Sequence, residues 1–198
     1  NIIVSIATIF LTSVISFLVL VENRKGKVNL SFALLGFSIV LWILSNVLAD
    51  LSTDISLAFF WTKLAIIWPT ILPNIFLYLV IQLYYFNERA KYKRISLMLF
   101  ILSSFIVLLS PTYLNITSVN IQSWGIDYEP GPLYYLLFFQ LIVGFGTIFY
   151  LLANVYKTSK DSEKHLQAKY MFIGAISTVV LATISNILLP ILNYGFGS

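Results

Sequence analysis

The sequence predicts an all-α fold, a polytopic transmembrane helical bundle. Hydrophobic residues make up 59% of the 198 residues and charged residues only 10%, whereas soluble domains carry about 25% charged residues. The mean hydropathy of +0.91 agrees with this composition. The apolar stretches run for about twenty residues without the polar alternation of a membrane β-barrel. The chain is therefore predicted to be an integral membrane protein.

Six apolar stretches are long enough to be predicted as spans. They are Ile2–Val21, Leu30–Ala49, Leu57–Phe86, Ile95–Leu109, Leu133–Tyr156 and Tyr170–Leu192. The first is interpreted as a membrane helix, because no basic region precedes it as in a secretory signal peptide. Residues 1–198 are expected to form a single domain. Because the chain starts at Asn1 rather than Met and ends just after an apolar stretch, we expect it to be part of a longer protein.

The basic residues predict the orientation of these spans. Connections 22–29, 87–94 and 157–169 hold eleven of the twelve Lys and Arg residues, and the other two connections hold none. The positive-inside rule therefore makes these three connections cytoplasmic and puts the N-terminus outside. A seventh span is expected after residue 198 if a cytoplasmic domain follows. The net charge of +4 is explained by a basic inner surface facing anionic lipid, so nucleic acid is not predicted as a partner.

The third predicted span is the longest and the most unusual. As a helix it would reach roughly 45 Å, while the hydrocarbon core is about 30 Å thick. Pro69 and Pro73 remove backbone donors within it and are predicted as a hinge. Lys63 is the one basic residue inside a predicted span. It is predicted either to pair with Asp50, with Asn46 beneath, or to snorkel to the outer headgroups as an anchor.

Polar and aromatic residues near the outer ends of the spans are candidates for binding a ligand or signal. They are Asn46, Asp50, Trp61, Lys63, Trp68, Tyr134, Gln140 and Asn186. The alternative interpretation is that the aromatic residues anchor the helices at the interface and that the amides join helices by hydrogen bonds. In the second span, small residues recur every seventh position at Ser31, Ser38 and Ser45, and Ser52 continues the series just outside the span, which predicts a packing seam.

The connection 110–132 is long enough to have a purpose of its own. Alternation around Trp124 and Gly125 predicts a small hairpin, followed by a turn at Pro130, Gly131 and Pro132. We interpret it as a candidate outer lid, with a loosely ordered surface loop as the alternative.

No signature of catalysis or of a bound cofactor is found in the sequence. There is no HExxH motif and no phosphate-binding glycine loop, and the single His165 lies in a charged connection. The absence of cysteine excludes disulfides and thiolate metal sites. We therefore expect no cofactor, no metal and no enzymatic activity in this region.

Four residue groups follow one another along the chain: Asn29–Leu35 followed by Leu41 and Trp42, Phe60–Leu64 with the later Pro73, Gly131–Tyr134, and Ser185–Pro190. Together they resemble the N-terminal seven-transmembrane input region of bacterial and archaeal sensor histidine kinases. The resemblance implies a receptor domain in the plasma membrane whose seventh helix, absent here, leads into a cytoplasmic PAS, GAF, kinase or cyclase domain. Its expected partners are the bilayer, an unknown small-molecule or membrane signal, that output domain in the same chain, and a possible second copy in a homodimer.

Two other functions stay open at this point. A transport or lipid-handling subunit would have a similar composition, although no internal repeat is evident. A light receptor of the rhodopsin type would need a retinal lysine in a helix outside this sequence, and the third span lacks the expected carboxylate counter-ion.

Overall fold

The computed structural model describes residues 2–122 and 125–183. The chain divides into two compact units, Asn1–Ile148 and Phe149–Ser198, and each is described by itself. Helix α5 begins in the first unit and ends in the second.

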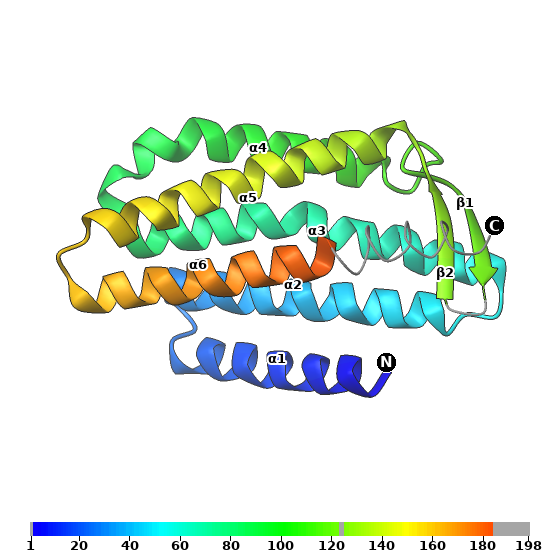
Figure 1. Ribbon diagram of the computed structural model, residues 1–198, viewed down its shortest axis with the longest axis horizontal. Helices are drawn as coiled ribbons and strands as arrows, with labels where there is room; N and C mark the ends of the chain where they lie inside the picture. The colour runs from blue at the N-terminus through cyan, green and yellow to red at the C-terminus, as the bar shows by residue number, and fades with distance from the viewer. Residues whose placement is uncertain (1, 123–124, 184–198) are drawn as a thin grey trace. The chain divides into compact units, whose positions relative to one another are not determined.

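Helices dominate the described residues (Figure 1). They are α1 (Ile2–Glu22), α2 (Lys27–Asp50), α3 (Ile55–Tyr84), the short 3-10 helix η1 (Phe86–Glu88), α4 (Arg89–Leu109), α5 (Pro132–Thr158) and α6 (Ser162–Thr183). Five helical segments are long and apolar enough to cross a membrane, and they coincide with the first five predicted spans. The sixth predicted span begins within α6, and its residues 184–192 lie outside the described residues, so the count of six stays a prediction.

The helices extend further into the basic connections than the predicted spans do. Helix α2 begins at Lys27, α4 at Arg89 and α6 at Ser162, so half of connection 22–29 and most of connections 87–94 and 157–169 are helical. The predicted spans are shorter than the helices there, because hydropathy marks only the part of a helix that lies in hydrocarbon. Backbone hydrogen bonding continues past that part into polar turns.

The serine series on α2 forms the predicted packing seam. Ser31, Ser38 and Ser45 are buried on α2, which packs against both α1 and α3, and Ser52 is buried just after the end of α2. Ser38 and Ser45 donate their hydroxyls to carbonyls four residues earlier, at 2.8 and 2.7 Å, so small side chains satisfy themselves and let neighbouring helices approach. Gly36 extends the seam toward α1, because a Cβ at this position would overlap the Ser16 hydroxyl.

The predicted hairpin is confirmed. Strands β1 (Ile116–Gln122) and β2 (Gly125–Pro130) pair antiparallel, with Val119 opposite Tyr128. Strand β1 contacts α3 and strand β2 contacts α2, at the end of the first unit opposite connections 22–29 and 87–94 (Figure 1). Gly131 closes the hairpin, since its N–H donates to Asn115 O at 2.8 Å and a Cβ there would overlap the Leu114 carbonyl.

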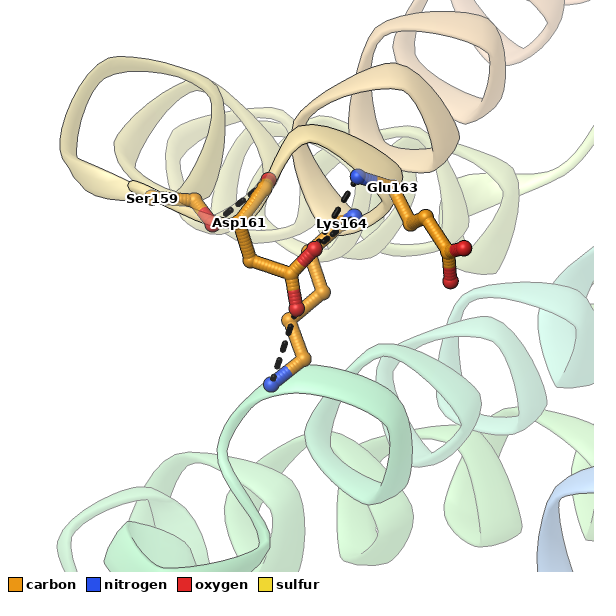
Figure 2. A network of polar contacts seen from close by, with 4 residues as sticks. All are labelled: Ser159, Asp161, Glu163 and Lys164. Carbon is orange, nitrogen blue, oxygen red and sulfur yellow. Dashed lines mark hydrogen bonds and ion pairs between the residues drawn. The ribbon is translucent and has the colours of Figure 1, made fainter.

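A tight polar turn joins α5 to α6 in the second unit (Figure 2). The Asp161 carboxylate accepts hydrogen bonds from the backbone N–H groups of Glu163 at 3.0 Å and Lys164 at 3.4 Å, which caps the first turn of α6. The Lys164 ammonium lies 3.9 Å from the same carboxylate. His165 stacks on Tyr156, with ring centroids 4.2 Å apart, so its ring packs within this turn.

Candidate functional site

Lys63 lies at the hairpin end of the first unit and binds the beginning of connection 110–132. Its Nζ donates to Pro111 O at 2.6 Å and lies 3.9 Å from the centroid of the Phe59 ring and 4.9 Å from that of Tyr113. A cation over two aromatic faces is attracted by their quadrupoles. The predicted ion pair with Asp50 does not form, because the chain after α4 folds back over α3 and supplies a carbonyl within reach of the ammonium.

Asp50 instead contacts strand β2, in the second half of connection 110–132. Its Oδ1 accepts a long hydrogen bond, 3.4 Å, from the N–H of Ile126 at the start of β2. Gly125 has a φ of +143°, and a Cβ there would lie 3.1 Å from the same oxygen, so a glycine suits both the turn and the approach of the carboxylate. Asn46 is exposed and donates to Trp42 O at 2.8 Å, within its own helix. Lys63 and Asp50 therefore do not bind each other. Each binds a different part of connection 110–132, Lys63 at Pro111 and Asp50 at Ile126.

The hairpin covers an apolar cluster at this end of α3, α4 and α5. The buried members are Ala58, Ile66, Ile106, Ile116, Val119, Leu133 and Leu137. Above it, the hydroxyls of Tyr128 and Tyr134 lie 3.1 Å apart. Burial, followed by the proximity of Tyr134 and Asp127, raises the pKa of Tyr128 far above its ordinary value. Either of the two hydroxyls can donate this hydrogen bond.

A second polar cluster joins three helices in the middle of the first unit. Gln140 of α5 is fully buried, and its Nε2 donates to Thr70 O at 3.1 Å and to the Ser103 hydroxyl at 2.9 Å. Asn74 Nδ2 donates to the same Ser103 oxygen at 2.6 Å. The buried Gln140 Oε1 has no hydrogen-bond partner in the part of the chain that the structure describes. This three-helix cluster therefore contains three interhelical hydrogen bonds and one buried acceptor, Gln140 Oε1, without a described partner.

The three-helix cluster lies where α3 contains its two prolines. Pro69 and Pro73 both lie inside α3, which continues from Ile55 to Tyr84 as one helix, and their role as a hinge stays a prediction. Each proline leaves the carbonyl four residues earlier without its usual helical donor. Pro73 is also packed by α5, because a Cβ at Gly144 would lie 2.6 Å from the Pro73 Cβ.

The aromatic candidates are distributed over separate contacts. Trp68 Nε1 donates to the Ser45 hydroxyl at 3.2 Å and so joins α3 to α2. Trp61 packs edge-on against Phe60, with ring centroids 5.1 Å apart. No described contact brings these two together with Tyr134 or Gln140, and Asn186 lies outside the described residues.

Sequence reasoning missed Thr70 and Ser103 as cluster members. A hydroxyl in a membrane helix usually bonds to its own backbone, as Thr70 Oγ1 does to Ile66 O at 2.8 Å, so neither residue stands out from the sequence. The only available signal was the presence of three polar residues on three successive apolar helices. No group of three or more His, Asp or Glu residues that could hold a metal ion is found within 2–122 and 125–183.

One comparison with known proteins identifies the chain. A family model described as the N-terminal 7TM region of histidine kinase matches residues 4–196. Searches of curated proteins and of solved structures found no match. The match covers nearly the whole chain and agrees with five apolar helices of spanning length. The chain therefore belongs to the N-terminal seven-transmembrane region of histidine kinases, a membrane sensory input region of a multi-pass plasma-membrane protein.

Proposed function

We propose that this domain detects an extracytoplasmic or membrane signal at its hairpin end and relays it through α3 to a cytoplasmic output domain such as a histidine kinase. In this proposal the N-terminus and the hairpin lie outside, and connections 22–29, 87–94 and 157–169 lie in the cytoplasm. The charge pattern supports this orientation, because the hairpin lies at the opposite end of the first unit from connections 22–29 and 87–94 (Figure 1).

The observation that carries the proposal is that α3 contacts both polar clusters. Near one end its Lys63 binds the start of the outer connection, and in its middle Thr70 and Asn74 bind Gln140 and Ser103. A signal that displaces the outer connection would remove the carbonyl and the Tyr113 ring from Lys63. The position of α3 relative to α4 and α5 would then change around the two prolines.

The size of this effect sets what the signal must supply. A cation–π contact contributes about 0.5–2 kcal/mol, so loss of one at Lys63 would shift a two-state equilibrium by roughly two- to thirtyfold. A ligand that prefers one arrangement of the outer connection by that amount would suffice to change the output.

The test is replacement of Lys63 by Met in the full-length protein. We expect altered basal or stimulated autophosphorylation without loss of membrane insertion, because Met keeps the apolar stem and removes the cation. Lys63→Arg keeps a cation over both rings and is expected to retain more of the response. Lys160→Met, at an exposed position in the α5–α6 turn, is the matched control. An unchanged response of Lys63→Met would remove Lys63 from the mechanism.

A further inference from the structure

A long apolar groove runs along the first unit between α2, α3 and α4. Its volume is about 800 Å³, within the range of ligand-binding sites. The surface of its walls is mostly apolar and comes from residues that include Leu30, Leu34, Ile71, Ile75, Leu97 and Phe100, while Asn74 and Ser103 of the three-helix cluster also line it. A groove of this composition between spanning helices suits a hydrocarbon chain.

A smaller and more polar cavity of about 390 Å³ adjoins the groove at the end with the basic connections. The two cavities share Tyr78, Lys93 and Ser96 in their walls. Lys27 at the start of α2 and Arg89 at the start of α4 line the smaller cavity as well. Three cationic side chains from two helices therefore surround the end of an apolar groove.

The three cations Lys27, Arg89 and Lys93 have no carboxylate partner among the residues that the structure describes. None of the three takes part in the ion pairs of the described residues, and the nearby Glu88 lies 3.9 Å from Lys91 instead. The Arg89 guanidinium lies 4.9 Å from the centroid of the Phe86 ring. The Ser96 hydroxyl is buried and has no hydrogen-bond partner in the described part of the chain. A buried hydroxyl without a partner costs stability, so a ligand oxygen at this position would be favourable.

We propose that these adjoining cavities bind one anionic phospholipid, with its phosphate among Lys27, Arg89, Lys93 and Ser96 and an acyl chain in the groove. A phosphate oxygen accepts hydrogen bonds from both cations and hydroxyls, and basic pockets at the cytoplasmic side of membrane helices suit lipid headgroups. The apolar groove selects a lipid over a free phosphate. The proposal goes beyond the sensing of an outer signal and rests on the proposed orientation only for the leaflet, which is the inner one.

The test uses the full-length protein in phosphatidylcholine nanodiscs that contain a minor fraction of photoactivatable phosphatidylglycerol. Cross-linked peptides are expected from the start of α2 and from the first half of α4. Each basic residue near a membrane surface contributes about fivefold to the affinity for an anionic lipid, so unlabelled phosphatidylglycerol should compete roughly a hundredfold better than phosphatidylcholine. Glycerol phosphate, which lacks acyl chains, should not compete.

Two sets of substitutions test the site itself. The triple variant Lys27→Gln, Arg89→Gln, Lys93→Gln is expected to lose the preference for phosphatidylglycerol. Its matched control is Arg24→Gln, Lys25→Gln, Arg94→Gln, which removes the same charge from exposed positions in the same two basic regions and should keep the preference.

Ser96→Ala provides a variant that does not disturb the charge. Because the hydroxyl has no partner to lose, the fold should be retained, and phosphatidylglycerol competition should weaken roughly tenfold. Equal loss in both triple variants, equal competition by the two lipids, or competition by glycerol phosphate alone would each overturn the proposal. These readouts measure binding, so they are independent of whether Lys63→Met changes signalling.

Discussion

Replacement of Gln140 by Leu tests the energetics of the three-helix cluster. Gln140 is fully buried and donates two hydrogen bonds, to Thr70 O at 3.1 Å and to the Ser103 hydroxyl at 2.9 Å. Its Oε1 is buried without a described partner. Leu has a similar size and no polar atom, so the substitution removes both the favourable bonds and the unsatisfied acceptor.

The magnitudes favour the apolar residue. Hydrogen bonds between membrane helices contribute about 0.6 kcal/mol each on average, so the two lost bonds cost roughly 1 kcal/mol. An unsatisfied buried acceptor costs about 1–3 kcal/mol, and its removal regains that amount. Ser103 keeps its bond to Asn74 at 2.6 Å, so little is left unpaired. We expect Gln140→Leu to leave the free energy of unfolding unchanged or to raise it by up to about 2 kcal/mol.

The assay is denaturant titration in mixed micelles of wild type, Gln140→Leu and Gln140→Ala. The alanine variant leaves a cavity and should lower the free energy of unfolding by about 2–4 kcal/mol. A double-mutant cycle with Ser103→Ala isolates the coupling between the two side chains. A loss of more than about 1.5 kcal/mol in Gln140→Leu would refute the reasoning, because the bonds to Gln140 would then exceed what interhelical amides contribute.

Two further predictions concern close approach and pH. Gly144→Ala should destabilise the first unit by about 1–3 kcal/mol, because its Cβ would lie 2.6 Å from the Pro73 Cβ. Gly146→Ala, two residues along the same helix with no atom within 4 Å, should be neutral or stabilising in the same titration. Because the pKa of Tyr128 is raised on folding above its ordinary value of 10.0, the unfolded chain ionises first. The stability of the hairpin is therefore constant below about pH 10 and falls above it, and Tyr128→Phe should remove that alkaline loss in a pH series of unfolding transitions.

Much of the fold could be predicted because the bilayer constrains each helix locally. The composition predicts a membrane protein, and the first five apolar stretches coincide with helices of spanning length. The serines that recur every seven residues on α2 lie on one face of the helix. Their small size predicts that this face packs against other helices, and they are buried. The hairpin could be predicted from alternation and turn residues, which are equally local.

The contacts of the polar residues could not be predicted in the same way. The ion pair of Lys63 with Asp50 was one of two alternatives predicted from the second and third spans. That prediction does not take into account the chain segment after α4. That segment folds back over α3, so that Lys63 donates to the Pro111 carbonyl and lies over the Tyr113 ring. The N–H of Ile126 in β2 donates to the Asp50 carboxylate. The predicted spans also begin later than helices α2, α4 and α6, since polar turns continue the helical hydrogen bonding beyond the apolar stretch.

Composition and periodicity are enough to predict the class of protein, the approximate position of five helices of spanning length, the small-residue face of α2 and a hairpin after α4. Only the packing of the helices shows that Gln140, Asn74, Thr70 and Ser103 meet, and that basic residues from α2 and α4 surround the end of an apolar groove. The physical reason is that hydropathy and periodicity describe one helix at a time. Which faces meet depends on how side chains of several helices pack together, and that information is shared among residues far apart in the chain.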